Sequence, residues 1–269
     1  MKYLRVNDYD MAFIEVGRGA PLVCVHGSLG DFRTWSPILG PLSRTQRVIT
    51  PSLRHFFPEP WDGSGGRYTI AQHVSDLTAF ITALDAGPVD LMGHSRGGHI
   101  AFRVAQQRPE LLRRLILAEP GGELDSSLAI VETGAAPTRT GRVAAAAKKI
   151  ALGDLDGGLK AFFDGAGGEG TWERFSGSYK QEYRDNARTL LGQVDEQRRP
   201  FTRKDAEAIA VPTLFIGGQR TTGTLPVVLR VLAQSVRNSR TVMIPNASHH
   251  MIRQDPVRTS AAVVEFLSC

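Results

Sequence analysis

The sequence predicts an α/β protein with a mostly parallel central sheet, helices on both faces, and one helical insertion. Short apolar runs bounded by Gly or Pro alternate with segments whose apolar residues recur every three or four positions. Such alternation of strand and helix is typical of a parallel sheet that is covered on both sides. The strand pattern stops after Pro120 and resumes at Pro212, and this gap predicts the insertion.

The first 120 residues supply most of the expected sheet. We expect strands at residues 11–16, 22–25, 47–50, 89–92 and 115–118. Helices are expected at residues 70–84, where Val74, Leu77 and Phe80 share one face, and at residues 97–107, which Pro109 closes. These elements form repeated strand–helix–strand units, from which parallel sheets are built.

The remaining residues divide into the insertion and the end of the core. From residue 121 to about 205 the chain is rich in Ala and Gly and shows no strand pattern. We expect helices at residues 139–152, 157–163 and 179–191, and a loop at the glycine-rich residues 165–170. Strands are expected again at 212–216 and 241–244, followed by a helix at 255–267. We therefore assign residues 1–122 and 206–269 to one core and residues 123–205 to the insertion.

The composition excludes several classes of protein. The 269 residues are 42% hydrophobic and 22% charged, with a formal net charge of +5, as expected of a folded globular chain. No apolar stretch approaches the roughly 20 residues that span a bilayer, and residues 1–10 lack a signal-peptide pattern. Two cysteines, Cys24 and Cys269, exclude a disulfide scaffold. We expect a cytoplasmic protein that does not bind membranes.

The positive charge does not indicate nucleic-acid binding. The arginines are scattered, and the small clusters at residues 113–114 and 198–199 lie near expected element ends. No basic run is interleaved with aromatic residues, as nucleic-acid surfaces usually are. The expected partner is a small molecule, and a homodimer is compatible with the sequence.

The strongest chemical signal is the segment Gly93-His94-Ser95-Arg96-Gly97. It matches the pattern G-x-S-x-G, follows an expected strand and precedes an expected helix, which is the context this motif requires. The two glycines let neighbouring chains approach a sharp turn, and the serine oxygen then projects above the sheet at the positive end of a helix. The spacing does not match the G-x-G-x-x-G of nucleotide-binding turns.

This arrangement resembles the serine hydrolases of the α/β-hydrolase family over nearly the whole chain. The matching segments are His26-Gly27-Ser28 after an early strand, the turn at Ser95, and Ser248-His249 followed by Asp255-Pro256. The resemblance implies an α/β-hydrolase fold, with residues 123–205 as the cap or lid that such enzymes carry at this place.

The resemblance also implies a catalytic triad. Ser95 is the expected nucleophile and His249 the expected general base, with the adjacent His250 as the alternative base. The family usually places its acid after the strand here expected at 212–216, but no carboxylate follows that strand until well past Pro226. Glu119, at the end of the 115–118 strand, is the best candidate, because some family members carry their acid there. Asp31 and Asp125 stay as alternatives.

Two backbone N–H groups are expected to form the oxyanion hole. One belongs to Arg96, directly after the nucleophile, and the other to Ser28, with Leu29 as the second choice. The side chain of Arg96 could bind a substrate carboxylate or pair with a buried carboxylate of the protein. The same two possibilities apply to Arg54.

The expected pocket is largely apolar, and its residues come from loops near the site and from the insertion. We expect neither a metal nor a cofactor, because no spacing of His, Asp or Glu suggests ligands. The candidate pocket residues are Leu29, Phe32, Trp35, His55, Phe56, Trp61, Phe162, Trp172 and His250.

The sequence favours a serine hydrolase that cleaves a carboxylic ester or lactone through an acyl-enzyme. Hydrolysis of a carbon–carbon bond in a dienoic ketone is the nearest alternative, because it uses the same triad; a carboxylate-binding Arg96 or Arg54 would favour it. A ligand receptor on a hydrolase scaffold is the alternative from another class. A strained nucleophile turn is not needed for binding alone, which argues against the receptor.

Overall fold

The central sheet has eight strands in the order β1-β2-β4-β3-β5-β6-β7-β8. A computed structural model describes residues 1–128 and 139–268. Only the pairs β1–β2 and β2–β4 are antiparallel, so the sheet is mostly parallel, as predicted. The strands are β1 (Lys2–Val6), β2 (Tyr9–Val16), β3 (Ala20–Val25), β4 (Gln46–Pro51), β5 (Val89–His94), β6 (Leu112–Ala118), β7 (Thr213–Gly218) and β8 (Ser239–Ile244).

From β3 onward, helices connect successive strands, and several helices fill the interval between β6 and β7. Two 3₁₀ turns, at Phe32–Trp35 and Pro109–Leu111, precede α1 and β6. None of the helices within the described ranges is long and apolar enough to cross a membrane. The α-helices are α1 (Ser36–Leu42), α2 (Ile70–Ala83), α3 (Arg96–Gln107), α4 (Arg139–Ala151), α5 (Leu155–Gly167), α6 (Gly177–Asp185), α7 (Thr189–Gln193), α8 (Arg203–Glu207), α9 (Leu225–Ser235), α10 (Met251–Gln254) and α11 (Pro256–Ser268).

Successive side chains of a strand point to opposite faces of the sheet, and helices cover both faces. In β3, Val23 and Val25 join the apolar cluster that includes α2, α3 and α9. Leu22 and Cys24 join a second cluster with α1 and α11. The continuous apolar runs of the central strands follow from this burial on two sides.

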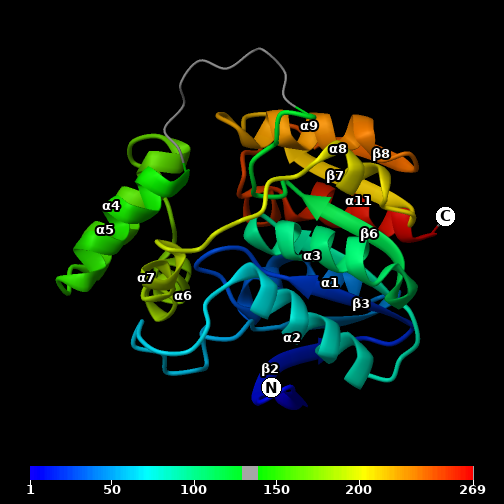
Figure 1. Cartoon of the computed structure of the whole chain (residues 1–269), viewed down its shortest axis with the longest axis horizontal. Helices are drawn as coiled ribbons and strands as arrows, with labels where there is room; N and C mark the ends of the chain where they lie inside the picture. The colour runs from blue at the N-terminus through cyan, green and yellow to red at the C-terminus, as the bar shows by residue number, and fades with distance from the viewer. Residues whose placement is uncertain (129–138, 269) are drawn as a thin grey trace.

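The inserted helices α4 to α7 lie together to one side of the sheet (Figure 1). They share a third apolar cluster, to which the core contributes Leu29. Residues 129–138 of the expected insertion lie outside the described residues. The assignment of residues 123–205 to a separate cap stays a prediction.

The expected elements are present, and the differences from the prediction have local causes. The expected helix at 179–191 is divided into α6 and α7, because the side chain of Asn186 donates to the carbonyl of Glu182 and to Asp31. The expected loop at 165–170 was wrong in part, since α5 continues to Gly167. Strand β1 and helices α1, α8, α9 and α10 were not predicted.

The close contact of α3 with the sheet can be tested at Gly97. A Cβ atom there would lie 2.2 Å and 2.3 Å from the carbonyl oxygens of Val25 and His26, which belong to the backbone and cannot yield cheaply. We expect Gly97→Ala to lower the free energy of unfolding by about 1–3 kcal/mol or more, measured by urea denaturation. Gly40→Ala, in α1 with nothing within 4 Å, is the control and should be neutral or stabilising. Equal stability of the two variants would contradict this packing.

Candidate active site

Ser95 lies at the turn between β5 and α3, in a backbone conformation that non-glycine residues seldom adopt. Its φ is 54° and its ψ is −118°. The turn is held on both sides, because Ser95 N–H donates to the carbonyl of Ala118 at 3.0 Å and Ser95 C=O accepts from Gly121 N–H at 2.8 Å. The side chain is partly exposed. These features match the nucleophile position that the motif predicted.

Glu119 follows β6 and contacts His249. Its side chain is 1% exposed, and its Oε2 lies 2.6 Å from His249 Nδ1. The other carboxylate oxygen, Oε1, accepts from Gly218 N–H at 2.8 Å. An ionised carboxylate only accepts, so Nδ1 of His249 carries the proton and Nε2 keeps its lone pair. This tautomer is the one a general base needs.

Gly218 is the last residue of β7, the strand after which the resemblance implies a catalytic acid. A Cβ atom at Gly218 would lie 2.5 Å from the carbonyl oxygens of both Ala247 and Ser248. The end of β7 therefore packs against the loop that carries His249, and the N–H of Gly218 binds the Glu119 carboxylate.

His94 also fixes the position of His249. Its Nε2 donates to the backbone carbonyl of His249 at 2.9 Å, and the two ring centroids are 4.5 Å apart. Burial, followed by the nearby His249, holds the pKa of His94 well below its usual range, so the ring is neutral. Because His94 directly precedes Ser95, this hydrogen bond joins the turn of Ser95 to the loop that carries the candidate base His249.

His250 has a different environment from its neighbour. Its ring lies 5.8 Å from that of Phe163 and 5.1 Å from that of Phe175, both in the insertion. Burial lowers the pKa of His250 to about 3. A base this weak is poorly matched to neutral pH, and the geometry therefore favours His249 for that role.

The two alternative acids have other partners. Asp31 caps the 3₁₀ turn and accepts from Arg33 and from Asn186 of the insertion. Asp125 accepts from the N–H and hydroxyl of Ser127. The carboxylate that the structure brings to His249 is that of Glu119.

The loop after β3 lies against the nucleophile. A Cβ atom at Gly27 would be 3.0 Å from Cβ of Ser95, which places Ser28 beside the turn. Ser28 is partly exposed, and its Oγ donates to Gln193 Oε1 at 2.9 Å. The backbone N–H of Arg96 opens α3 on the other side. The loop that carries Ser28 thus approaches the turn at which Arg96 begins α3.

Both arginines that sequence analysis left open are paired with protein carboxylates. The Arg96 guanidinium is 1% exposed and donates to Glu196 Oε1 from Nε at 3.1 Å and also from Nη2. Arg54 donates to Asp76 and to Asp8 at 2.7–3.0 Å. In the structure, both Arg96 and Arg54 are therefore paired with carboxylates of the protein itself.

Three candidate pocket residues were predicted wrongly, because Leu29, Trp35 and Phe56 have no accessible surface. Trp35 packs in the core cluster with α1 and α11, on the sheet. Phe56 lies under His26, with ring centroids 4.6 Å apart. Leu29 packs into the cluster of the inserted helices.

The other candidate pocket residues are buried to different degrees. Trp172 is buried among aromatic rings of the insertion, including that of Phe163 at 5.9 Å. Phe32 and His55 are mostly buried, and His55 stacks on Trp61 at 4.4 Å. Trp61 and Phe162 are partly exposed, and so is His250, although its ring packs against Phe163 and Phe175.

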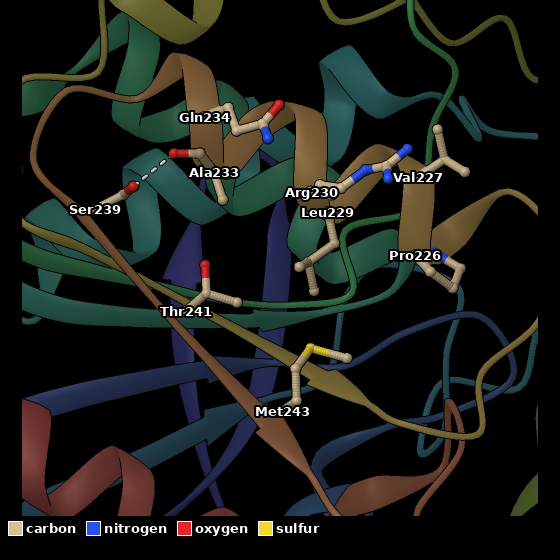
Figure 2. Close-up of a pocket in the computed structure, with 9 residues that line it drawn as sticks. All are labelled: Pro226, Val227, Leu229, Arg230, Ala233, Gln234, Ser239, Thr241 and Met243. Atoms are coloured by element: carbon tan, nitrogen blue, oxygen red, sulfur yellow. Dashed lines mark hydrogen bonds between the residues drawn. The ribbon is translucent and has the colours of Figure 1, made fainter. Parts of the chain in front are cut away.

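A groove of about 620 Å³ lies elsewhere, between α9 and the edge strand β8 (Figure 2). Leu229, Ala233 and Met243 give it an apolar wall, and Arg230 and Thr241 lie beside them. None of its lining residues is a predicted site residue, so this groove is separate from the Ser95 turn.

The chain belongs to the alpha/beta hydrolase fold family, whose sequence profile matches residues 20–256. It is 36% identical over 107 residues to a 2-hydroxy-6-oxo-2,4-heptadienoate hydrolase of Pseudomonas putida, a match that covers 38% of each chain. The relatives at 30–36% identity are matched over 35–41% of their own length.

Solved structures share the fold at low identity. An esterase from Thermogutta terrifontis has a TM-score of 0.77 and 24% identity, over 96% of this chain and 93% of that one. The enol-lactonase of Burkholderia xenovorans has a TM-score of 0.78 and 20% identity, over 99% and 100% of the two chains.

Sequence analysis missed three residues that contact the site. Gly218 binds the Glu119 carboxylate, Gln193 binds Ser28, and Glu196 binds Arg96. Only Gly218 had a sequence signal, since a glycine pair occupies the place where an acid was expected. The contacts of Gln193 and Glu196 join residues about 100 or more positions apart and have no local pattern.

The low pKa of His250 predicts its behaviour on titration. Because burial disfavours the charged ring, His250 should stay neutral between about pH 8 and pH 5, well above its folded-state pKa of about 3. We expect its Cε1–H resonance in proton NMR, assigned by its loss in His250→Gln, to keep one chemical shift over this range. A titration midpoint inside the range would contradict the low pKa that we attribute to the packing of the ring against Phe163 and Phe175.

Proposed function

We propose that the protein is a serine hydrolase that cleaves a carboxylic ester or a lactone. The observation that carries this proposal is the contact of Glu119 with Nδ1 of His249, in a loop that His94 joins to the turn on which Ser95 is held at positive φ. A carboxylate that fixes the imidazole tautomer is the support that a serine nucleophile needs. The small-molecule partner enters beneath residues 123–205, which we propose act as the cap.

The mechanism follows from the residues. Ser95 Oγ attacks the carbonyl carbon while Nε2 of His249 takes the hydroxyl proton, and Glu119 stabilises the resulting imidazolium. The carbonyl oxygen becomes an oxyanion, which the N–H groups of Ser28 and Arg96 stabilise. The imidazolium then gives its proton to the departing alkoxide, and an acyl-enzyme forms. Water, deprotonated by His249, releases the acid and regenerates Ser95.

Carbon–carbon bond hydrolysis is the second candidate, since the Pseudomonas putida relative is named as a hydrolase of a dienoate. That reaction would gain support from an arginine that holds a substrate carboxylate. Arg96 and Arg54 are instead paired with Glu196 and with Asp76 and Asp8. This pairing favours the ester or lactone. A receptor without catalysis is the least favoured, because binding does not need a strained serine on the turn that His94 joins to the loop of a His–Glu pair.

The triad is tested with a panel of p-nitrophenyl esters and simple lactones. We expect Ser95→Ala and His249→Ala to lower kcat by roughly 10⁴- to 10⁶-fold, and Glu119→Gln by up to about 10⁴-fold. His250→Ala should be much milder, since its weakly basic ring is not the base. Asp125→Asn is the control for loss of a carboxylate and should be close to wild type.

Two results would contradict these assignments. A nearly normal rate in Glu119→Gln would move the acid to another residue. If His250→Ala were inactive while His249→Ala stayed active, His250 would be the general base in place of His249. If the folded wild type cleaves no ester or lactone, a carbon–carbon bond hydrolase and a receptor remain as hypotheses. Reaction of Ser95 with a phosphonate probe separates them, since a receptor would leave the serine unreacted.

The support that β7 gives to the base is tested at Gly218. A Cβ atom there would displace the carbonyls of Ala247 and Ser248, and with them His249. A shift of about 1 Å in catalytic geometry costs on the order of 10²-fold, so Gly218→Ala should lower kcat by about that factor. Gly217→Ala is the matched control, because its nearest atoms belong to the side chains of Leu229 and Met243, which can yield. Equal rates in the two variants would contradict the proposed role of Gly218.

A further inference from the structure

The segment that returns from the inserted helices to the core contacts both residues whose N–H groups are expected to form the oxyanion hole. Gln193 is the last residue of α7 and is 2% exposed. Its Oε1 accepts from Ser28 Oγ at 2.9 Å. Three residues later, Glu196 is 4% exposed and accepts from the Arg96 guanidinium. One short stretch of chain thus contacts both Ser28 and Arg96.

The Ser28 contact acts on a loop with a strained residue. Leu29 has a φ of 63°, a conformation that branched side chains seldom adopt. Its side chain has no accessible surface and packs with Leu190 and other residues of the inserted helices. A strained turn keeps its shape only where its surroundings over-determine it. Here the inserted helices supply an apolar contact at Leu29 and a hydrogen bond at Ser28.

The Arg96 contact is part of a buried network. Glu196 Oε2 also accepts from Arg198 Nε at 2.7 Å, so one carboxylate holds two guanidinium groups. Arg96 Nη2 lies 2.7 Å from His73 Nδ1, and the Arg96 Cζ lies 4.8 Å from the centre of the Tyr68 ring. Because arginine can only donate, His73 accepts at Nδ1, and its Nε2 donates to the carbonyl of Arg54 at 3.1 Å. Arg96 is therefore fixed in three directions.

The ionic form of Glu196 suits this arrangement. Burial alone would raise its pKa, but attraction to Arg96 and Arg198 and their hydrogen bonds outweigh burial and lower the pKa to about 2. The carboxylate therefore stays charged at all pH values at which the protein would work.

We propose that Gln193 and Glu196 are positioning residues for the oxyanion hole, so that the segment returning from the insertion completes the catalytic site. Oxyanion stabilisation depends on donors that are held in place before the reaction begins. Gln193 acts through Ser28, and Glu196 acts through Arg96. This inference rests on the proposed hydrolase function and extends it, because the insertion then sets the rate of the chemical step in addition to covering the site.

The experiment centres on Gln193→Met, which keeps the length of the side chain and removes the acceptor for Ser28. Complete loss of one oxyanion donor typically costs 10²- to 10³-fold, so a displaced donor should cost about 10-fold in kcat. KM for the best p-nitrophenyl ester should change by less than about threefold, because the ground-state carbonyl depends less on these donors. Affinity for a trifluoromethyl ketone analogue, which forms a tetrahedral adduct with the serine, should fall by the same factor as kcat.

Thr189→Val is the matched control in the same helix. Thr189 is 1% exposed, and its Oγ1 donates to the carbonyl of Asn186 at 2.7 Å, a hydrogen bond within the inserted helices. It should leave kcat and the affinity for the ketone unchanged. Ser28→Ala keeps the backbone N–H and removes the hydroxyl, so the double variant with Gln193→Met should be no slower than the slower single variant.

Glu196→Gln tests the second arm, with circular dichroism to establish that the variant folds. A folded Glu196→Gln variant should also have a lower kcat and an unchanged KM. If this variant does not fold, the Gln193→Met variant alone tests the inference. A Gln193→Met enzyme with the kcat of Thr189→Val, or with effects that add to those of Ser28→Ala, would overturn the inference alone. A wild type without Ser95-dependent turnover would overturn the proposed function and this inference with it.

Discussion

The carboxylate of Glu119 is the group on which the geometry of the site depends. One oxygen binds Nδ1 of His249 in the loop after β8, and the other binds the N–H of Gly218 at the end of β7. Glu119 itself adopts a φ of 43°, a conformation that costs free energy and persists only when its contacts over-determine it. Its N–H donates to Ile216 C=O, so β7 and the loop after β8 both converge on this one residue.

Neutral histidines connect the loops around this carboxylate. His26 donates from Nδ1 to the carbonyl of Gly27 and accepts at Nε2 from the N–H of Leu53. His94 joins the nucleophile turn to the loop of His249, and His73 joins Arg96 to the carbonyl of Arg54. Burial lowers the pKa of each of these three rings, to about 4 for His26. A neutral imidazole donates at one nitrogen and accepts at the other, which suits it to joining two backbone segments in a dry interior.

The fold could be predicted from the sequence because it depends on local patterns, and the same kind of pattern led to the residues of the candidate triad. Ser95 has a motif with fixed spacing, and Glu119 follows a strand whose carboxyl end must share an edge with that of its parallel neighbours. The partners of Ser28 and Arg96 were not readable, since Gln193 and Glu196 reach them only through the path of the inserted helices. Trp35 was placed in the pocket wrongly because a sequence does not reveal which side of a short turn faces the core. Helix α9 was missed although Leu229 and Leu232 lie on its buried face.

The central claim is that the Glu119 carboxylate holds the proton of His249 Nδ1. A strongly hydrogen-bonded imidazole proton, shielded from solvent, gives a far-downfield signal in proton NMR, so the wild type should show one that couples to the His249 ring nitrogen. This signal should disappear in Glu119→Gln and persist in Asp125→Asn and Asp31→Asn. Survival of the signal in Glu119→Gln, or its loss in either aspartate variant, would show that another carboxylate holds His249.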